Sequence, residues 1–317
     1  MRVLIALGGN AMTGPEGSAT PQDQERAIVE AMAHVADLVA RGVDVVLTHG
    51  NGPQVGNLLV KNELAAGVVP PVPLDWCGAQ TQGTIGFLIM DAPDRALAER
   101  GVDRRVSTVV TRTRVDGQDP GFRTPTKPIG RYLSKDEAAT LIEHGQTWQD
   151  RGDKGWRRVV ASPEPLEILD APAMRALGEA GFVVVGAGGG GIPVVRDDDG
   201  TLHGVEAVID KDLAAALLAR EIGADVLVIA TDVDNAMLDY GTGTARPIGR
   251  VTTEDMRAHI AEGQFASGSM GPKVEAAVRF VEQGGTRSVI TSLHRIADAV
   301  TPRGPTDTPA GTVIENT

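Results

Sequence analysis

The chain has 317 residues, of which 42% are hydrophobic, and a formal net charge of −12 at pH 7. That length allows one large α/β domain or two closely packed lobes with a core that needs no cross-links. The acidic balance argues against a surface for duplex nucleic acid, and the single cysteine, Cys77, excludes an internal disulfide and a zinc ribbon. No apolar stretch approaches the about 18–20 residues of a spanning helix, so we expect a cytoplasmic protein without a membrane partner.

The first third of the chain alternates predicted strands and helices. An apolar run at residues 3–7 indicates a buried strand that ends at Gly8 and Gly9. The next predicted elements are a helix that starts at Thr20-Pro21 and ends at Gly42, a strand at residues 43–48, helices at 54–66 and 78–100, and a strand at 106–115. Such alternation predicts a mainly parallel sheet covered on both faces.

Residues 116–158 interrupt this alternation. They are rich in Gly, Pro, Asp and Arg, and they show little apolar periodicity. Because Trp148 and Trp156 need something to pack against, we predict a small excursion from the main sheet and not a disordered linker.

The alternation resumes in the second half. In chain order the predicted elements are a helix near residues 172–180, a strand at 182–185, a glycine-rich turn at 186–191, an amphipathic helix at 213–221, a strand at 225–230, helices at 254–262 and 272–283, and a final core strand at 288–291.

Four glycine-rich turns each follow a strand or lead into a helix. Glycine lets the backbone approach a ligand closely, and exposed N–H groups at helix starts bind phosphate oxygens. For any one of these turns, the alternative to phosphate binding is that the glycines only allow a tight turn. The turns are residues 8–10, 50–52, 186–191 and 268–271.

Residues 186–191 match the dinucleotide-binding pattern G-x-G-x-x-G, which must open a helix. Here Ile192 and Pro193 follow, and they indicate a strand. The Rossmann interpretation therefore fails, and the chain contains no G-x-x-x-x-G-K-[ST] phosphate loop either.

Lysine is scarce, because only six of the 30 basic residues are lysines. Lys211 and Lys273 lie at predicted helix starts, where the helix dipole disfavours a cation unless an anion is bound there. A surface ion-pair cluster at Lys211 and a tolerated exposed lysine at Lys273 are the alternatives.

The turn at residues 231–234 is either an ordinary polar turn or the rim of a nucleotide pocket. Among the histidines only His49, in a glycine turn, is a candidate for a functional role.

Together these stretches resemble the signature motifs of carbamate kinases, members of the amino-acid-kinase superfamily. Relatives such as acetylglutamate kinase carry a lysine two residues before the first Gly-Gly pair, where this chain has Ala6. Carbamate kinases supply a substitute from a protruding subdomain, and Lys127 matches it. The matching motifs are residues 7–11 (LGGNA), 48–56 (THGNGPQVG), 127–130 (KPIG), 188–193 (GGGGIP), 208–212 (VIDKD) and 268–274 (GSMGPKV).

The resemblance implies an α/β fold, a three-layer α-β-α sandwich with a mainly parallel central sheet and a small protruding subdomain. It implies a single domain over residues 1–317, with an acceptor lobe at 1–222, the protruding subdomain at about 116–158, a nucleotide lobe at 223–317, and a homodimer. The chain departs from the family at Ala236-Met237, where a tyrosine is usual, although methionine can fill the same space.

The implied activity is reversible phosphoryl transfer, in which ATP and carbamate give ADP and carbamoyl phosphate, serving ATP formation in arginine or related nitrogen catabolism. Its cofactors are ATP or ADP and Mg²⁺, and we expect no metal ion held by protein ligands alone. The candidate catalytic residues are Lys127, Lys211, Lys273 and Asp210; those for substrate and phosphate are Gly8, Gly9, Asn10, Gly50, Asn51, Gly52, Gly188 and Gly189; those for nucleotide are Thr231, Asp232, Val233, Met270, Gly271 and Lys273.

Three other functions remain open from the sequence. One is a kinase of the same superfamily that acts on an N-acyl amino acid or a phosphonate. A less favoured one is a NAD-dependent oxidoreductase that uses residues 186–191. The third is a nucleotide sensor that binds ATP without turnover, against which the presence of all three candidate lysines counts.

Overall fold

The computed structural model describes residues 1–9, 13, 20–266, 269–301 and 308–316. Among these residues the main sheet has eight strands, and every neighbouring pair is parallel except β16 and β17. The mainly parallel sheet is thus confirmed. In spatial order the strands are β15 (Arg250–Thr252), β17 (Thr312–Glu315), β16 (Arg287–Ser292), β12 (Val226–Thr231), β1 (Arg2–Leu7), β2 (Asp44–His49), β9 (Val183–Val185) and β3 (Val106–Thr108).

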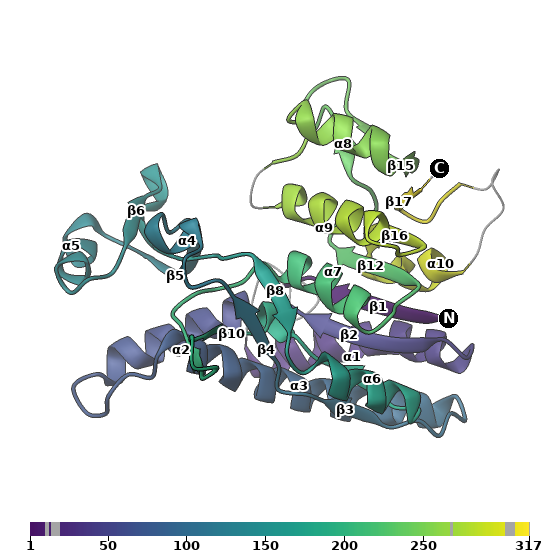
Figure 1. The fold of residues 1–317 in the computed structure, drawn as a ribbon, viewed down its shortest axis with the longest axis horizontal. Helices are drawn as coiled ribbons and strands as arrows, with labels where there is room; N and C mark the ends of the chain where they lie inside the picture. Colours follow the sequence, from purple (N-terminus) through teal and green to yellow (C-terminus); the bar gives the residue numbers. More distant parts are fainter. Residues whose placement is uncertain (10–12, 14–19, 267–268, 302–307, 317) are drawn as a thin grey trace.

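Helices cover both faces of this sheet (Figure 1). Successive side chains of a strand point to opposite faces, so Ile5 of β1 joins the apolar cluster of one face and Leu4 that of the other. The three-layer α-β-α sandwich is therefore confirmed. On the Ile5 side lie α1 (Pro21–Ala40), α3 (Leu74–Glu99) and α10 (Ile296–Val300); on the Leu4 side lie α6 (Ala171–Glu179), α7 (Lys211–Glu221), α9 (Met270–Glu282) and, at the outer edge, α8 (Thr253–Ala261).

The prediction of one strand over residues 106–115 is wrong. The segment forms β3 in the main sheet and then β4 (Arg112–Val115) in a second sheet. At the break the Thr111 hydroxyl donates to the Val109 carbonyl, and the Thr111 amide donates to Gln82 of α3. These bonds replace the ladder contacts of a continuous strand. The second sheet has the order β11 (Leu202–Gly204), β10 (Ile192–Arg196), β4 and β8 (Pro165–Ile168).

Helix α7 is present as predicted, but it is not amphipathic. Six consecutive residues, from Ala214 to Ala219, are buried, and so is Asp212. The reason is the second sheet, because α7 contacts β8 and α9 as well as β1 and β12 of the main sheet. A helix packed on several sides has no solvent-facing stripe.

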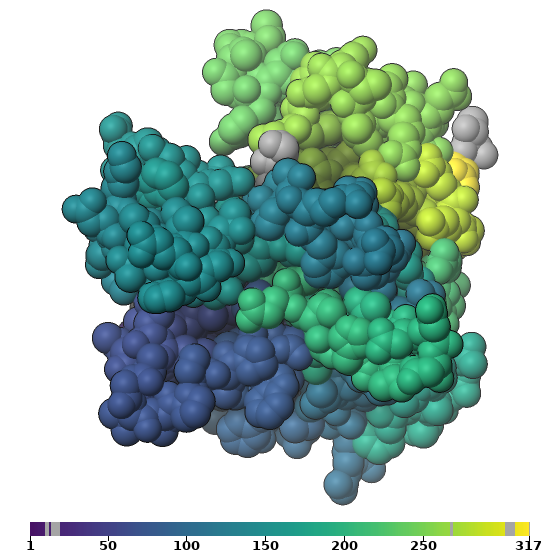
Figure 2. Space-filling model, turned by 60° about the vertical axis from the view of Figure 1, so that its left-hand side comes forward, coloured from purple at the N-terminus to yellow at the C-terminus, as the bar shows by residue number. Residues whose placement is uncertain are grey.

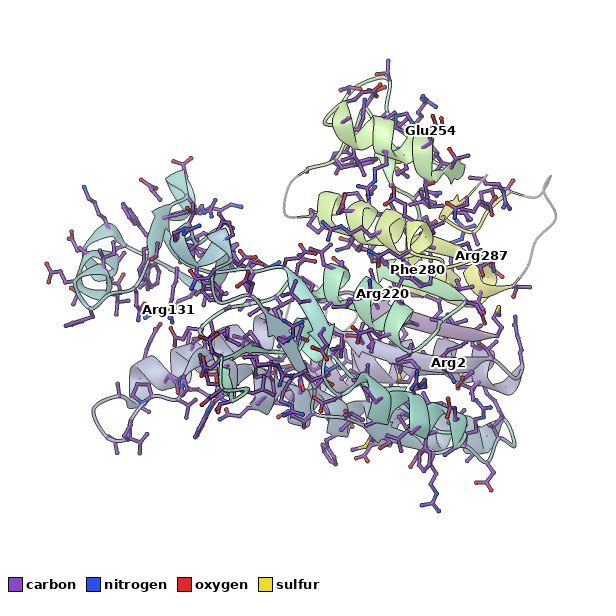
Figure 3. The ribbon with its side chains drawn as sticks, viewed as in Figure 1. Arg2, Arg131, Arg220, Glu254, Phe280 and Arg287 are labelled. Carbon is purple, nitrogen blue, oxygen red and sulfur yellow. The ribbon has the colours of Figure 1, made fainter. Side chains whose placement is uncertain are left out.

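The excursion forms a small three-stranded sheet of β5 (Lys127–Leu133), β7 (Trp156–Val160) and β6 (Trp148–Asp150), with α5 (Lys135–Glu143). Trp148 is buried with Leu133, and Trp156 packs against them, so the predicted packing partners exist. Figure 1 shows this subdomain projecting from the sandwich. Arg131 projects from it toward α2 (Gly52–Ala65), where it pairs with Glu63 (Figure 3).

The remaining described elements are short. They are α4 (Pro120–Arg123), the hairpin of β13 (Met237–Leu238) and β14 (Arg246–Pro247), and three 3₁₀ helices, η3 (Gly152–Lys154), η4 (Gly188–Gly190) and η5 (Leu293–Arg295). None of the helices within the described ranges has the length and apolar character needed to cross a membrane.

Candidate active site

A cleft of about 1380 Å³ opens where β1, β2 and β12 end. The carboxyl ends of parallel strands are the usual place for a ligand in an open α/β sheet. Figure 2 shows the surface hollowed between the protruding subdomain and the C-terminal part of the chain. Side chains far apart in the sequence line this one cleft, among them Lys127, Lys211 and Lys273.

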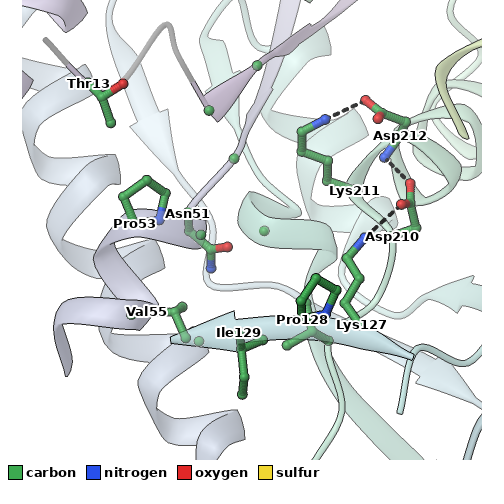
Figure 4. A pocket seen from close by; sticks show the side chains of 18 of the residues that line it. Thr13, Asn51, Pro53, Val55, Lys127, Pro128, Ile129, Asp210, Lys211 and Asp212 are labelled. Atoms are coloured by element: carbon green, nitrogen blue, oxygen red, sulfur yellow. Dashed lines mark hydrogen bonds and ion pairs between the residues drawn. The ribbon is translucent and has the colours of Figure 1, made fainter. Parts of the chain in front are cut away.

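The three lysines are held by two carboxylates, and Figure 4 shows the pairs of Lys127 with Asp210 and of Lys211 with Asp212. Lys127, at the start of β5, donates to Asp210 over 2.9 Å. Lys211 and Lys273 both donate to Asp212, over 2.7 and 3.1 Å. Five charges therefore meet in one place with an excess of one positive charge, which suits an anionic ligand.

Asp210 and Asp212 hold their lysines from the start of one helix. Asp210 is the N-cap of α7, and its other oxygen accepts from the amides of Asp212 and Leu213. The side chain of Asp212 is only 4% exposed, so it depends on both lysines to offset its loss of water. Both carboxylates are therefore occupied in orienting ammonium groups.

The shifts in pKa follow from this arrangement. Burial on its own lowers the pKa of Lys211, but Asp212 and Asp210 outweigh it, and the pKa is raised. For Lys273 burial, helped by the charge of Lys211, outweighs Asp212, and the pKa is lowered. Burial would raise the pKa of Asp210, yet Lys127 lowers it. Asp210 is thus a stable carboxylate and a poor proton acceptor.

Two of the predicted glycine turns face the cleft with bare backbone. Gly8 and Gly9 follow β1, and Gly50 and Gly52 flank Asn51 at the start of α2. A β-carbon built on Gly52 meets no described atom within 4 Å, and one built on Gly50 lies 3.6 Å from Cδ of Lys211. The backbone of Gly50 therefore lies against the side chain of Lys211, and its amide donates to the carbonyl of Leu7.

The five-glycine turn is different, because most of it is packed. A β-carbon on Gly188 would overlap the ring of His49, and one on Gly191 would overlap Thr113. Gly188 is buried and does not line the cleft, whereas Gly189 does line it. The turn leads into β10 and not into a helix, so the Rossmann interpretation is excluded.

His49 is a structural residue. It is 2% exposed, and its Nδ1 donates to the carbonyl of Gly50 over 2.9 Å. Burial lowers its pKa to about 4, although this hydrogen bond acts in the opposite direction. A neutral ring that packs on Gly188 explains its place in the glycine turn.

Most of the predicted site residues are brought together. Thr231 and Asp232 line the cleft, whereas Val233, Met270 and Gly271 do not. Asn10 and Gly268 lie outside the described residues. The residues at the cleft that were predicted are Gly8, Gly9, Gly50, Asn51, Gly52, Lys127, Gly189, Asp210, Lys211, Thr231, Asp232 and Lys273.

Sequence reasoning missed three supporting residues. Asp212 bridges two lysines, Thr81 of α3 accepts from the Asn51 amide, and Gln82 links Thr111 to the carbonyl of Gly188. Only Asp212 carried a signal, because it is a carboxylate within the same motif as Lys211. Over the described part of the chain, no group of three or more His, Cys, Asp or Glu residues is placed to hold a metal ion.

Comparison with known proteins agrees with this cleft. A carbamate kinase of Thermococcus kodakarensis is 46% identical over 303 residues, which are 94% of this chain and 96% of that protein. A carbamate kinase-like protein of Escherichia coli is 46% identical over 311 residues, with 96% and 97% covered. The structure of carbamate kinase from Giardia lamblia bound to AMP-PNP superposes with a TM-score of 0.92 at 39% identity, covering 100% of this chain and 98% of that one.

The amino acid kinase family profile matches residues 1–292. With this sandwich and a lysine-rich cleft at its strand ends, the chain is a phosphotransferase of the amino acid kinase family. Its full-length similarity to several carbamate kinases places it, within that family, among the carbamate kinases.

Proposed function

We propose that the protein catalyses reversible phosphoryl transfer in which ATP and carbamate give ADP and carbamoyl phosphate. The observation that carries the proposal is the cleft, where three ammonium groups from β5, α7 and α9 meet two turns of bare backbone. Related carbamate kinases support the choice of acceptor, and the relative with bound AMP-PNP supports ATP as the donor.

The chain's own residues supply position and charge. Phosphoryl transfer needs in-line placement and stabilisation of charge more than covalent help. In this proposal Lys211 and Lys273 hold the nucleotide phosphates, and Lys127 acts on the acceptor side. The backbone amides of Gly9 and Gly52 bind phosphate oxygens.

No residue is needed as a base, because a carbamate oxygen is already anionic at neutral pH. This agrees with the pairing of Asp210 to Lys127. Mg²⁺ belongs to the proposal as a companion of the nucleotide that neutralises its phosphates, and no protein ligand is assigned to it.

The same proposal assigns the two substrates to different parts of the chain. Residues 1–222, with the protruding subdomain, bind the acceptor, and residues 223–317 bind the nucleotide, with Val233, Met270 and Gly271 on the nucleotide side. A homodimer, a cytoplasmic location and a role in ATP formation from arginine or related nitrogen compounds complete the proposal on the basis of family resemblance.

One coupled assay tests the proposal. Purified protein is given ADP, Mg²⁺ and carbamoyl phosphate, and ATP is detected through hexokinase and glucose-6-phosphate dehydrogenase. Carbamoyl phosphate should give rapid ATP formation, and in the reverse direction acetylglutamate and aspartate should not be phosphorylated. ATP binding without turnover of any acceptor would instead identify a sensor, and preference for another acceptor would identify a different kinase.

A further inference from the structure

The side-chain amide of Asn51 has a fixed orientation. Its Nδ2 lies 2.8 Å from Oγ1 of Thr81, and that hydroxyl lies 2.7 Å from the carbonyl of Gly78, one turn earlier on α3. A hydroxyl has a single hydrogen, and the carbonyl of Gly78 can only accept it. The Thr81 oxygen must therefore accept from the NH₂ group of Asn51, which leaves the Asn51 oxygen on the opposite side.

The Oδ1 atom of Asn51 accepts no hydrogen bond from any described residue. Asn51 lines the cleft, and Figure 4 shows this oxygen turned to the side on which Lys127 and Lys211 lie. The amide lies against the backbone of Gly189, where a β-carbon would overlap it, and the hydrogen bond to Thr81 decides which of its two ends faces the cleft.

The Asn51 oxygen is an acceptor in a cleft that also holds three lysine side chains. The ammonium groups and bare amides around it are donors, which match the oxygens of a phosphate or a carboxylate. The carboxylates of Asp210 and Asp212 are acceptors as well, but they are paired with lysines. The Asn51 oxygen therefore fits a part of the ligand that carries hydrogen on nitrogen, which no phosphate offers.

We propose that the Asn51 oxygen accepts a hydrogen bond from the amino group of carbamate or carbamoyl phosphate, and that Thr81 is the positioning residue that keeps it turned toward the cleft. The inference rests on the proposed function and adds the determinant of acceptor specificity. A methyl group in place of the amino group leaves this oxygen without a partner, and a site built for a hydrogen bond rejects such an analogue.

The experiment compares two phosphoryl donors of similar shape, with ADP as acceptor. Carbamoyl phosphate carries the amino group, and acetyl phosphate carries a methyl group in its place. The ratio of their kcat/KM values is measured for the unmodified protein, Thr81→Val and Thr81→Ser. If acetyl phosphate turns over too slowly, its inhibition constant against carbamoyl phosphate takes the place of its kcat/KM.

Thr81→Val frees the Asn51 amide to rotate, so the preference for carbamoyl phosphate should fall about tenfold, the size of one neutral hydrogen bond. The loss should be in the carbamoyl phosphate value, with acetyl phosphate within about twofold of the unmodified protein. Thr81→Ser keeps the hydroxyl and should retain the preference. Asn51→Ala removes the oxygen without touching the buried side of α3 and should repeat the loss.

An equal fall for both donors, or an unchanged ratio in both Thr81→Val and Asn51→Ala, would overturn the inference while leaving the proposed function intact. An unmodified protein that makes no ATP from carbamoyl phosphate would overturn the proposed function, and the inference with it.

Discussion

The two kinds of glycine turn in this cleft are similar in composition and different in surroundings. In residues 186–191 the missing side chains make room for neighbours, since Gly188 lies under His49 and Gly191 under Thr113. In the turn at Gly50-Asn51-Gly52 a β-carbon on Gly52 would meet no described atom within 4 Å. Glycine makes room for neighbouring side chains in the first turn, whereas Gly52 in the second turn leaves open space beside the cleft.

This difference shows why glycine content alone does not identify a phosphate-binding loop. Two side-chain hydrogen bonds hold the packed turn in place. The Thr48 hydroxyl donates to the carbonyl of Ala187 over 2.9 Å, and the Thr113 hydroxyl donates to the carbonyl of Gly190 over 2.9 Å. The open turn instead faces Lys211. Substitutions in the packed turn should therefore change stability, and substitutions around the open turn should change activity.

The largest expected effect is a loss of activity in variants of the lysines beside the open turn. Lys211→Met or Lys273→Met removes one preorganised charge, which typically costs about 10²–10³ in rate. The chain should stay folded, because Asp212 keeps one lysine partner in either variant. ATP formation from carbamoyl phosphate measures the loss.

Lys135→Met is the matched control, since Lys135 also starts a helix but lies outside the cleft. It should keep full activity. Near-normal turnover in Lys211→Met or Lys273→Met would remove that lysine from the mechanism.

The second effect is a change with pH in the free energy of unfolding, and it comes from His49, which packs on the turn at residues 186–191. The pKa of His49 is lowered to about 4 by burial, while in the unfolded chain it returns to its ordinary value of 6.5. Between these values the unfolded chain binds the extra proton, so this stability is complete above about pH 6.5 and is lost as the pH falls toward 4. The loss amounts to about 3 kcal/mol over that range.

The free energy of unfolding, measured by urea titration between pH 7 and 4.5, tests this prediction. His49→Gln cannot titrate, so its stability should fall less steeply than that of the unmodified protein as the pH drops. Parallel curves for the two proteins would show that His49 is not buried as a neutral ring.

A smaller effect is expected for Gly188→Ala. The added methyl group would overlap the His49 ring, and overpacking of this kind typically costs about 1–3 kcal/mol. Gly83→Ala on α3, where a β-carbon meets no described atom within 4 Å, is the control and should be neutral or slightly stabilising. Equal unfolding free energies for the two variants would contradict the packed turn.

The smallest stability change is expected for Gly52→Ala on the open turn. Gly52 is the first residue of α2, so alanine should leave the unfolding free energy within about 0.5 kcal/mol. Activity should still fall, because the new methyl group crowds the backbone amides that face the cleft. A variant that unfolds at lower urea but keeps full activity would reverse the assignment of the two turns.

The alternation of strands and helices and the order of the motifs were sufficient to predict the sandwich, the protruding subdomain and the meeting of the three lysines. These depend on local periodicity and on family resemblance. The double burial of α7 and the strand β17 were not predictable in the same way, because both depend on segments distant in sequence. The same holds for Gly188, whose role is decided by the ring of His49 and not by its glycine neighbours.

The central claim is that Lys127, Lys211 and Lys273 act together on a phosphoryl group in one cleft. A crystal structure of the protein with ADP, Mg²⁺, aluminium fluoride and carbamate tests it most directly. We predict that all three ammonium nitrogens lie about 3 Å from oxygens or fluorides of the bound anions, with the amides of Gly9 and Gly52 in the same shell. Anions bound elsewhere, with the three lysines still held only by Asp210 and Asp212, would contradict the claim.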